Sequence, residues 1–100
     1  MMEERRIEMN NLYDCYKSLL TDNERNCFIN YYFEDLTLSE IATNNNVSRS
    51  AIQKTIKTVE NKLEEYEEKL NILKTRKLLE LAKEMDIKEA KAIIDKILSN

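Results

Sequence analysis

The sequence predicts an all-α fold, a helix-turn-helix bundle in which the second helix of the motif continues into a long helix and a short helix ends the chain. Three observations lead to this class. The 100 residues include neither Gly nor Pro, the residues that most often mark the turns between strands. Apolar residues recur at intervals of three and four along most of the chain, which is the helical period. Capping-box pairs mark three helix starts.

Two helices are expected ahead of the motif. Residues 3–20 carry apolar side chains at helical spacing and form the first helix, whose tyrosines we interpret as core and boundary residues. Thr21 and Glu24 form a capping box, with Leu20 placed as a hydrophobic staple. The second helix covers about residues 22–34 and is apolar around most of its circumference, so we expect it to be the most buried helix.

Residues 36–57 have the pattern of a helix-turn-helix. Thr37 and Glu40 form another capping box and open a short helix. The small side chain of Ala42 allows a second helix to cross close to it. Three asparagines at residues 44–46 end this helix, because Asn tolerates the left-handed backbone that a sharp turn needs.

The second helix of the motif carries the candidate DNA-binding residues. Val47 is expected to be a hydrophobic plug after the turn, and Ser48 is a favourable N-cap. Ile52 and Ile56 direct the helix back onto the first one. In this motif the N-terminal residues of the second helix meet base edges in the major groove. The side chains expected to face DNA are those of Ser48, Arg49, Ser50, Gln53, Lys54 and Lys57.

The same helix is expected to extend well beyond the motif. No helix breaker is evident before Asp86, which predicts a helix of about 35 residues, or roughly 50 Å. A heptad seam runs along it and needs a partner, either the first helix of the same chain or the same helix of a second copy. The seam favours a coiled-coil homodimer, and a mixture of both arrangements is left open. The dimer or packing seam consists of Ile56, Val59, Leu63, Tyr66, Leu70 and Leu73.

The end of the chain forms one more amphipathic helix. A capping box of Asp86 and Glu89 opens it. Part of an adaptor, a dimer clamp and a lid over the long helix are all compatible with this pattern. The chain therefore divides into a helical core over residues 1–62 and an extension over residues 63–100, which serves coiled-coil pairing or dimerisation.

Charge and hydropathy restrict the partners of the protein. The net charge of −3 argues against a general nucleic-acid coat. Residues 36–62 nevertheless have four basic and two acidic side chains, a net charge of +2, whereas residues 1–35 have a net charge of −4. The positive segment contains the helix-turn-helix. There is no signal-peptide pattern and no apolar run of ~18 residues, so we expect a cytoplasmic protein that does not insert into a membrane.

The composition argues against enzyme activity. Without Gly there is no phosphate-binding loop, and without His there is no common general base near neutral pH. Cys15 and Cys27 lack the spacing of a metal site, and we interpret them as buried apolar residues in a reducing compartment. The carboxylates of residues 64–68 are expected to be solvated on a helix face. We expect no catalytic residue, no cofactor and no metal.

The order of these motifs resembles known bacterial proteins. The segments LTDNERNCFINYYFEDLTLSEIA and VSRSAIQKTIKTVENKL are similar to the fourth region of sigma-70-type factors, which reads a promoter element through a helix-turn-helix. Residues 9–73 as a whole resemble the small YlxM-type proteins. The resemblance implies a sigma-region-4-like fold and a link to the signal recognition particle, because such proteins are typically encoded beside its genes. Two positions depart from the pattern: Asn46 replaces the turn Gly, and Thr55 replaces an apolar residue.

Two hypotheses about function follow. In the first, the protein regulates transcription by binding double-stranded DNA, and a homodimer places two recognition helices on successive half-sites. Arg49 and Gln53 would read base edges, while Lys54 and Lys57 would contact phosphates. In the alternative, the helix-turn-helix is a scaffold without DNA readout, and the long helix docks on a protein or ribonucleoprotein partner such as a component of the signal recognition particle.

Overall fold

The computed structural model of the protein describes residues 3–99, and every regular element in that range is helical. The all-α class and the helix-turn-helix bundle are confirmed. The outermost residues of the two predicted segments, 1–2 and 100, lie outside the described range. In chain order the elements are α1 (Glu3–Tyr16), the 3-10 turn η1 (Lys17–Leu19), α2 (Asp22–Phe28), the π-helical turn η2 (Ile29–Phe33), α3 (Leu38–Asn45), α4 (Arg49–Leu70), α5 (Ile72–Lys83) and α6 (Ile87–Leu98).

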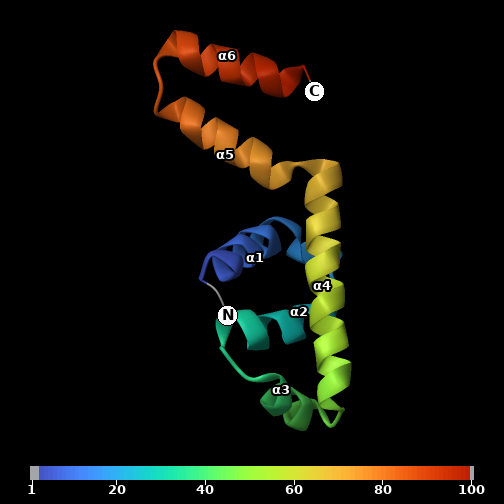
Figure 1. Ribbon diagram of the computed structural model, residues 1–100. Coiled ribbons are helices and arrows are strands. Elements are labelled where there is room, and N and C mark those ends of the chain that lie inside the picture. The colour runs from blue at the N-terminus through green and yellow to red at the C-terminus, as the bar shows by residue number, and fades with distance from the viewer. Residues whose placement is uncertain (1–2, 100) are drawn as a thin grey trace.

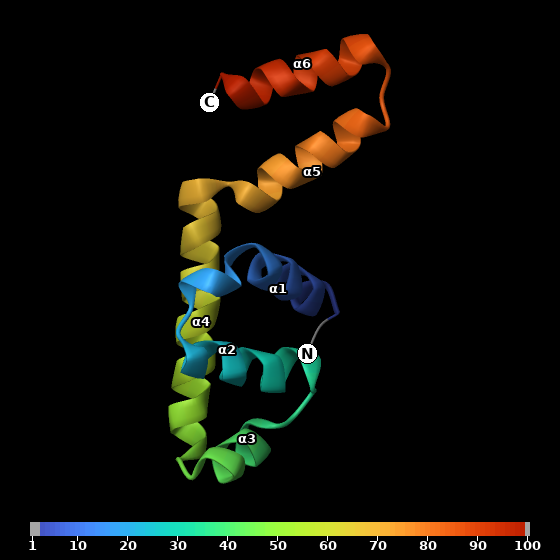
Figure 2. The same ribbon diagram turned by 180° about the vertical axis from the view of Figure 1, so that it is seen from behind.

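Helix α4 is the axis on which the other helices are arranged. In Figures 1 and 2, α1, α2 and α3 follow one another along one side of α4, with α3 at its N-terminal end. Helices α5 and α6 form a hairpin that projects from the C-terminal end of α4. The molecule measures 56 × 23 × 18 Å and has a radius of gyration of 17.1 Å, whereas a compact chain of this length has about 13 Å. The projecting hairpin accounts for the elongated shape.

The core forms where one side of α4 meets the first three helices. Tyr13 of α1 stacks on Phe28 of α2 with ring centroids 4.5 Å apart, and Phe28 stacks on Tyr32 at the same distance. Such pairs add to the area that the rings bury. The core cluster includes Leu63 and Leu73, which lie beyond residue 62. The predicted division into a core over residues 1–62 and an extension over residues 63–100 therefore stays a prediction. The buried apolar residues of this cluster are Met9, Leu12, Tyr13, Tyr16, Leu20, Cys27, Phe28, Tyr32, Ile41, Ala42, Ile52, Ile56, Val59, Leu63 and Leu73.

Local hydrogen bonds confirm most of the expected helix starts. Both halves of the capping box are present at Thr21, where α2 begins, and at Thr37, where α3 begins. Ser48 caps α4 by accepting a hydrogen bond of 3.1 Å from the Ala51 amide. At α6 the Asp86 carboxylate accepts from the Glu89 amide at 2.9 Å, but the Glu89 carboxylate accepts no bond from the Asp86 amide in return. Each of these side chains satisfies a donor that the first helical turn leaves free.

The long helix is shorter than expected. Helix α4 has 22 residues, or about 33 Å, and it ends before Asn71, whose φ is 54°. The predicted unbroken helix to Asp86 is therefore wrong. Asn71 adopts the left-handed conformation, as Asn46 does at φ 55° in the motif turn. A second asparagine thus turns the chain and separates α5 from α4.

Two expectations about burial are also corrected. Val47 is 47% exposed and does not plug the turn, because Ile41, Ala42 and Ile52 already fill the crossing of α3 and α4. The second helix is buried only in part. It passes at residue 29 from α-helical to π-helical geometry, and Phe33 at its end is exposed. A wider turn rotates side chains out of the α-helical phase on which the expectation rested.

A hydrogen-bonded joint holds the bend between α4 and α5. Glu67 of α4 accepts bonds of 3.0 Å from the amides of Leu73 and Lys74. The Tyr16 hydroxyl donates to Glu67 at 2.6 Å and accepts from the Ile72 amide at 3.0 Å. Burial, followed by the bond to Glu67, raises the pKa of Tyr16 to about 12. These partners satisfy three free donors at the start of α5, so the hairpin leaves the body at a defined angle.

Candidate nucleic-acid interface

The crossing of α3 and α4 positions the candidate interface. Ile41 and Ala42 of α3 are buried against α4, which turns Ile52 and Ile56 inward. The left-handed Asn46 lets the chain reverse within a few residues. The Val47 amide closes the turn by donating to the Ala42 carbonyl at 3.1 Å. The N-terminal turn of α4 therefore lies at one end of the molecule.

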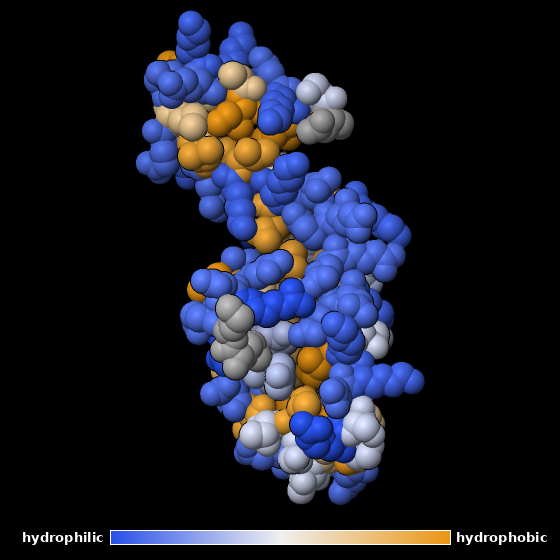
Figure 3. All heavy atoms as spheres, viewed as in Figure 1, coloured by the Kyte–Doolittle hydropathy of each residue, from blue (hydrophilic) through white to orange (hydrophobic). Residues whose placement is uncertain are grey.

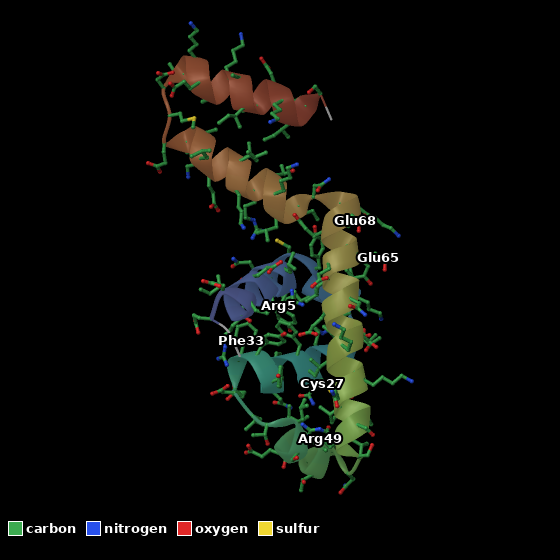
Figure 4. All side chains as sticks on the ribbon, viewed as in Figure 1. Arg5, Cys27, Phe33, Arg49, Glu65 and Glu68 are labelled. Carbon is green, nitrogen blue, oxygen red and sulfur yellow. The ribbon has the colours of Figure 1, made fainter. Side chains whose placement is uncertain are left out.

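All six candidate DNA-binding residues are exposed at this end. None of them belongs to the buried core, which takes up the opposite side of α4. Figure 4 shows Arg49 where α3 and α4 meet. The Ser48 and Ser50 hydroxyls lie 3.2 Å apart beside the free amides of the first turn. The N-terminus of a helix favours an anion such as a phosphate, because its dipole and its free amides both point outward there.

A groove of about 660 Å³ runs along part of this surface. Ser50, Gln53, Lys54 and Lys57 all line it, so the fold brings four of the six candidates to the same groove. Arg49 and Ser48 do not line the groove and stand at the start of the helix. The other lining residues are Tyr31, Leu38, Ile56, Thr58, Glu60 and Asn61.

Tyr31 is a groove residue from outside the helix-turn-helix that the sequence did not predict. It comes from η2, so no spacing within the motif could place it beside α4. Its ring is half-buried and meets that of Tyr32 edge to face, with centroids 5.1 Å apart. A π-helical turn of this kind is a common feature of functional sites. The sequence signal available was the aromatic run at residues 31–33, which helical periodicity assigns to the core.

The basic side chains of the positive segment differ in whether they form ion pairs. Within residues 3–99, no carboxylate lies within 4.0 Å of the charged groups of Arg49, Lys54 and Lys57. Lys62, the fourth basic residue of the positive segment, instead pairs with Glu24 at 2.6 Å. Three unpaired cations therefore remain at the N-terminal half of α4.

Acidic residues set the boundary of this positive end. Glu60 lines the groove and accepts a hydrogen bond from the Tyr32 hydroxyl. Further along α4, Glu64, Glu65, Glu67 and Glu68 follow in close succession, and Figure 4 shows Glu65 and Glu68 near the opposite end of the helix from Arg49. Because a polyanion is repelled by these carboxylates, the electrostatics favour contact at the first half of α4 only.

The ion pair of Glu24 and Lys62 joins α2 to α4 behind the interface. The Glu24 side chain is also the second half of the capping box of α2. Burial raises the pKa of Glu24, but hydrogen bonds from Lys62 and the Thr21 amide outweigh burial, and the net pKa is lowered. A charged Glu24 is thus preferred in the folded protein.

The heptad seam divides into an internal part and an exposed part. Ile56, Val59 and Leu63 are buried against helices of the same chain. Tyr66 is half-buried, with its ring centroid 5.9 Å from that of Tyr16. Beyond it the seam breaks at the bend: Leu73 packs into the core from α5, whereas Leu70 is 53% exposed. The first three seam positions therefore already have a partner within the chain.

The described residues contain neither a metal-binding cluster nor a membrane-spanning helix. Across residues 3–99, no three His, Cys, Asp or Glu side chains gather in a way that could bind a metal ion. None of the helices in that range combines the length and the apolar character needed to cross a bilayer. Cys27 is buried and Cys15 half-buried, each as a free thiol whose pKa burial raises.

Comparison with known proteins identifies relatives over the full described length. The profile of the UPF0122 family, described as "Putative helix-turn-helix protein, YlxM / p13 like", matches residues 3–99. A UPF0122 protein of Shouchella clausii is 39% identical over 105 aligned positions, which cover 96% of each chain. One from Halalkalibacterium halodurans is 43% identical over 93 positions, covering 89% of this chain and 85% of the relative. One from Malacoplasma penetrans is 55% identical over 62 positions, or 62% of this chain and 58% of the relative.

Proposed function

This chain belongs to the UPF0122 family of helix-turn-helix proteins, and we propose that it is a cytoplasmic regulator that binds double-stranded DNA through the first half of α4. The family is not an enzyme family. The observation that supports DNA binding most strongly is the combination of a helix-turn-helix with three unpaired cations, Arg49, Lys54 and Lys57, on the exposed start of its second helix. Cationic side chains at the start of a recognition helix can contact base edges and phosphates when the helix lies in the major groove.

The proposed roles follow from position along the helix. Arg49 stands at the first residue of α4 and Gln53 one turn later, where a helix inserted into the major groove meets base edges. Lys54 and Lys57 line the adjoining groove and would contact phosphates. Ser48 and Ser50 add hydroxyls and free amides that favour a phosphate near the helix N-terminus.

Duplex binding tests this proposal. Fluorescence anisotropy with genomic duplex fragments at ~50 mM salt should show specific binding that weakens steeply as salt is raised. Arg49→Glu should abolish binding. Lys69→Glu is the matched control, because it makes the same charge change on the same helix at the acidic end. Absence of affinity for any duplex, or equal binding by Arg49→Glu and the wild type, would refute the proposal.

A second candidate function is an adaptor for a protein or ribonucleoprotein, for example a component of the signal recognition particle. One feature favours it: a groove of about 800 Å³ where α1, α4 and α5 meet. Leu12, Leu73 and Leu78 provide its apolar surface, and charged side chains from all three helices surround them. Such a mixture suits a folded partner more than a bare phosphate backbone.

The adaptor function is tested by capture of purified signal recognition particle components on the immobilised protein. Lys74→Glu and Lys77→Glu alter the rim of the groove without removing core residues. Loss of capture with these variants, while Arg49→Glu captures normally, would favour the adaptor over DNA binding. Equal capture by all variants would count against the groove.

A further inference from the structure

Large exposed apolar residues gather on the hairpin of α5 and α6. Figure 3 shows hydrophobic side chains across the side of the hairpin that faces the viewer. Helix α6 has no buried residue at all, although seven of its twelve residues are Ile, Leu or Ala at amphipathic spacing. The exposed members are Ile72, Leu79 and Leu81 of α5 and Ile87, Ile94 and Leu98 of α6.

Five of these residues form two stripes. In α6, Ile94 follows Ile87 by seven residues and Leu98 follows Ile94 by four, so the three lie along one side of the helix. In α5, Leu79 follows Ile72 by seven residues and defines a similar stripe. Ile87 and Leu98 are 88% and 78% exposed, which is unusual for side chains of this size. We call these five residues the hairpin face.

Charged residues of opposite sign border the two stripes. On α5, Arg76 and Glu80 lie four residues apart next to Leu79. On α6, Lys91 and Asp95 lie four residues apart next to Ile94. None of the four forms an ion pair within residues 3–99. The order of the signs is positive then negative on both helices.

The turn of the hairpin places these charges at matching heights. Arg76 lies seven residues before Lys83, where α5 ends, and Asp95 lies eight residues after Ile87, where α6 begins. Glu80 lies three residues before Lys83, and Lys91 four residues after Ile87. At these two heights, the border of α5 therefore has the opposite sign to the border of α6. A surface with this property is complementary to itself about a two-fold axis along the hairpin.

We infer that the hairpin face packs against the hairpin face of a second copy of the chain, forming an intermolecular four-helix bundle. Each α5 lies antiparallel to the α6 of the other copy, with Arg76 opposite Asp95 and Glu80 opposite Lys91. In such a bundle, the exposed apolar sides of the two helix pairs are buried against each other. The homodimer predicted from the sequence thus forms through the hairpin instead of through the buried part of the heptad seam.

Sedimentation equilibrium of the full chain without DNA tests this interface. The wild type should show twice the monomer mass at concentrations on the order of 10 μM. Ile94→Asp with Leu98→Asp should give a monomer, because both charges would be buried in the bundle. Leu19→Asp, which changes a leucine of η1 that is 51% exposed, should remain dimeric. Since α6 buries nothing in the body, circular dichroism should show the body folded in every variant.

A charge exchange tests the pairing itself. Arg76→Glu should raise the dimer dissociation constant on the order of tenfold, because it sets two carboxylates against each other. Adding Asp95→Arg in the same chain should restore the wild-type constant. A monomeric wild type, a dimeric Ile94→Asp Leu98→Asp variant, or a double exchange that stays as weak as Arg76→Glu would each overturn the inference. A monomer that binds duplex DNA would overturn the interface and leave the DNA-binding proposal intact.

Discussion

The Tyr16 hydroxyl donates a hydrogen bond of 2.6 Å to the Glu67 carboxylate and accepts one of 3.0 Å from the Ile72 amide. One phenol thus connects α1 to both sides of the bend between α4 and α5. Glu67 completes the joint by accepting from the amides of Leu73 and Lys74. Because the ring of Tyr16 is fully buried, water cannot replace these bonds easily. The direction of the hairpin relative to the body depends on this joint.

Tyr16→Phe should destabilise the protein by about 1–3 kcal/mol, because it leaves the Ile72 amide without a buried partner. Urea unfolding followed by circular dichroism measures the loss. Hydrogen exchange of the Ile72 amide should accelerate more than that of α2 amides. Tyr66→Phe is the matched control, since no hydrogen bond is found for that hydroxyl in the described part of the chain. If the two variants were equally stable, the joint would not contribute to stability.

Leu63→Ala should cost about 2–5 kcal/mol, because Leu63 is fully buried in the core of the single chain. Leu70→Ala, the same change one heptad later, should cost less than about 1 kcal/mol, since Leu70 is exposed. Thermal unfolding at low and at high protein concentration distinguishes a seam packed within one chain from a seam that pairs two copies. Similar losses at both positions would indicate that the seam pairs two copies along its whole length.

Asn71→Gly should keep the bend and change stability by less than about 1 kcal/mol, because Gly adopts a positive φ without a steric penalty. Asn71→Ala should destabilise by about 1–2 kcal/mol, or straighten the junction of α4 and α5. Chemical denaturation reports the first effect, and small-angle scattering reports the second as an increase in the radius of gyration. Equal behaviour of the two variants would mean that the left-handed residue is not what sets the bend.

Acid should weaken the contact between α2 and α4 through Glu24. Its pKa is lowered in the folded protein, so its stabilising contribution is complete above the ordinary value of 4.5 and is lost as pH falls through the folded pKa. Between about pH 5 and about pH 3 the wild type should therefore lose more stability than Glu24→Gln. Denaturation midpoints over this range measure the difference. A parallel fall of both proteins would assign the acid sensitivity to other carboxylates.

Local signals allowed much of the helix-turn-helix to be predicted. The caps at Thr21, Thr37 and Ser48 act within three residues of themselves, so they can be recognised in a linear sequence. The same is true of the left-handed Asn46, which follows the last turn of α3. The exposed side of α4 follows from the spacing of its isoleucines, because helical phase alone separates that side from the core.

Contacts between distant residues decided the rest. The residues next to Asn71 in the sequence do not predict a helix end. The chain bends at Asn71 where Tyr16, fifty-five positions away, accepts a hydrogen bond from the start of α5. The groove brings Tyr31 of η2 together with Lys57 of α4, which lie far apart in the sequence. The sequence by itself determined the helices, their caps and the polar side of α4, since these depend on short-range steric and hydrogen-bonding preferences. Only the tertiary structure decided that the first part of the seam is buried within one chain and that the apolar side of the hairpin is left uncovered, because burial depends on which surfaces meet in space.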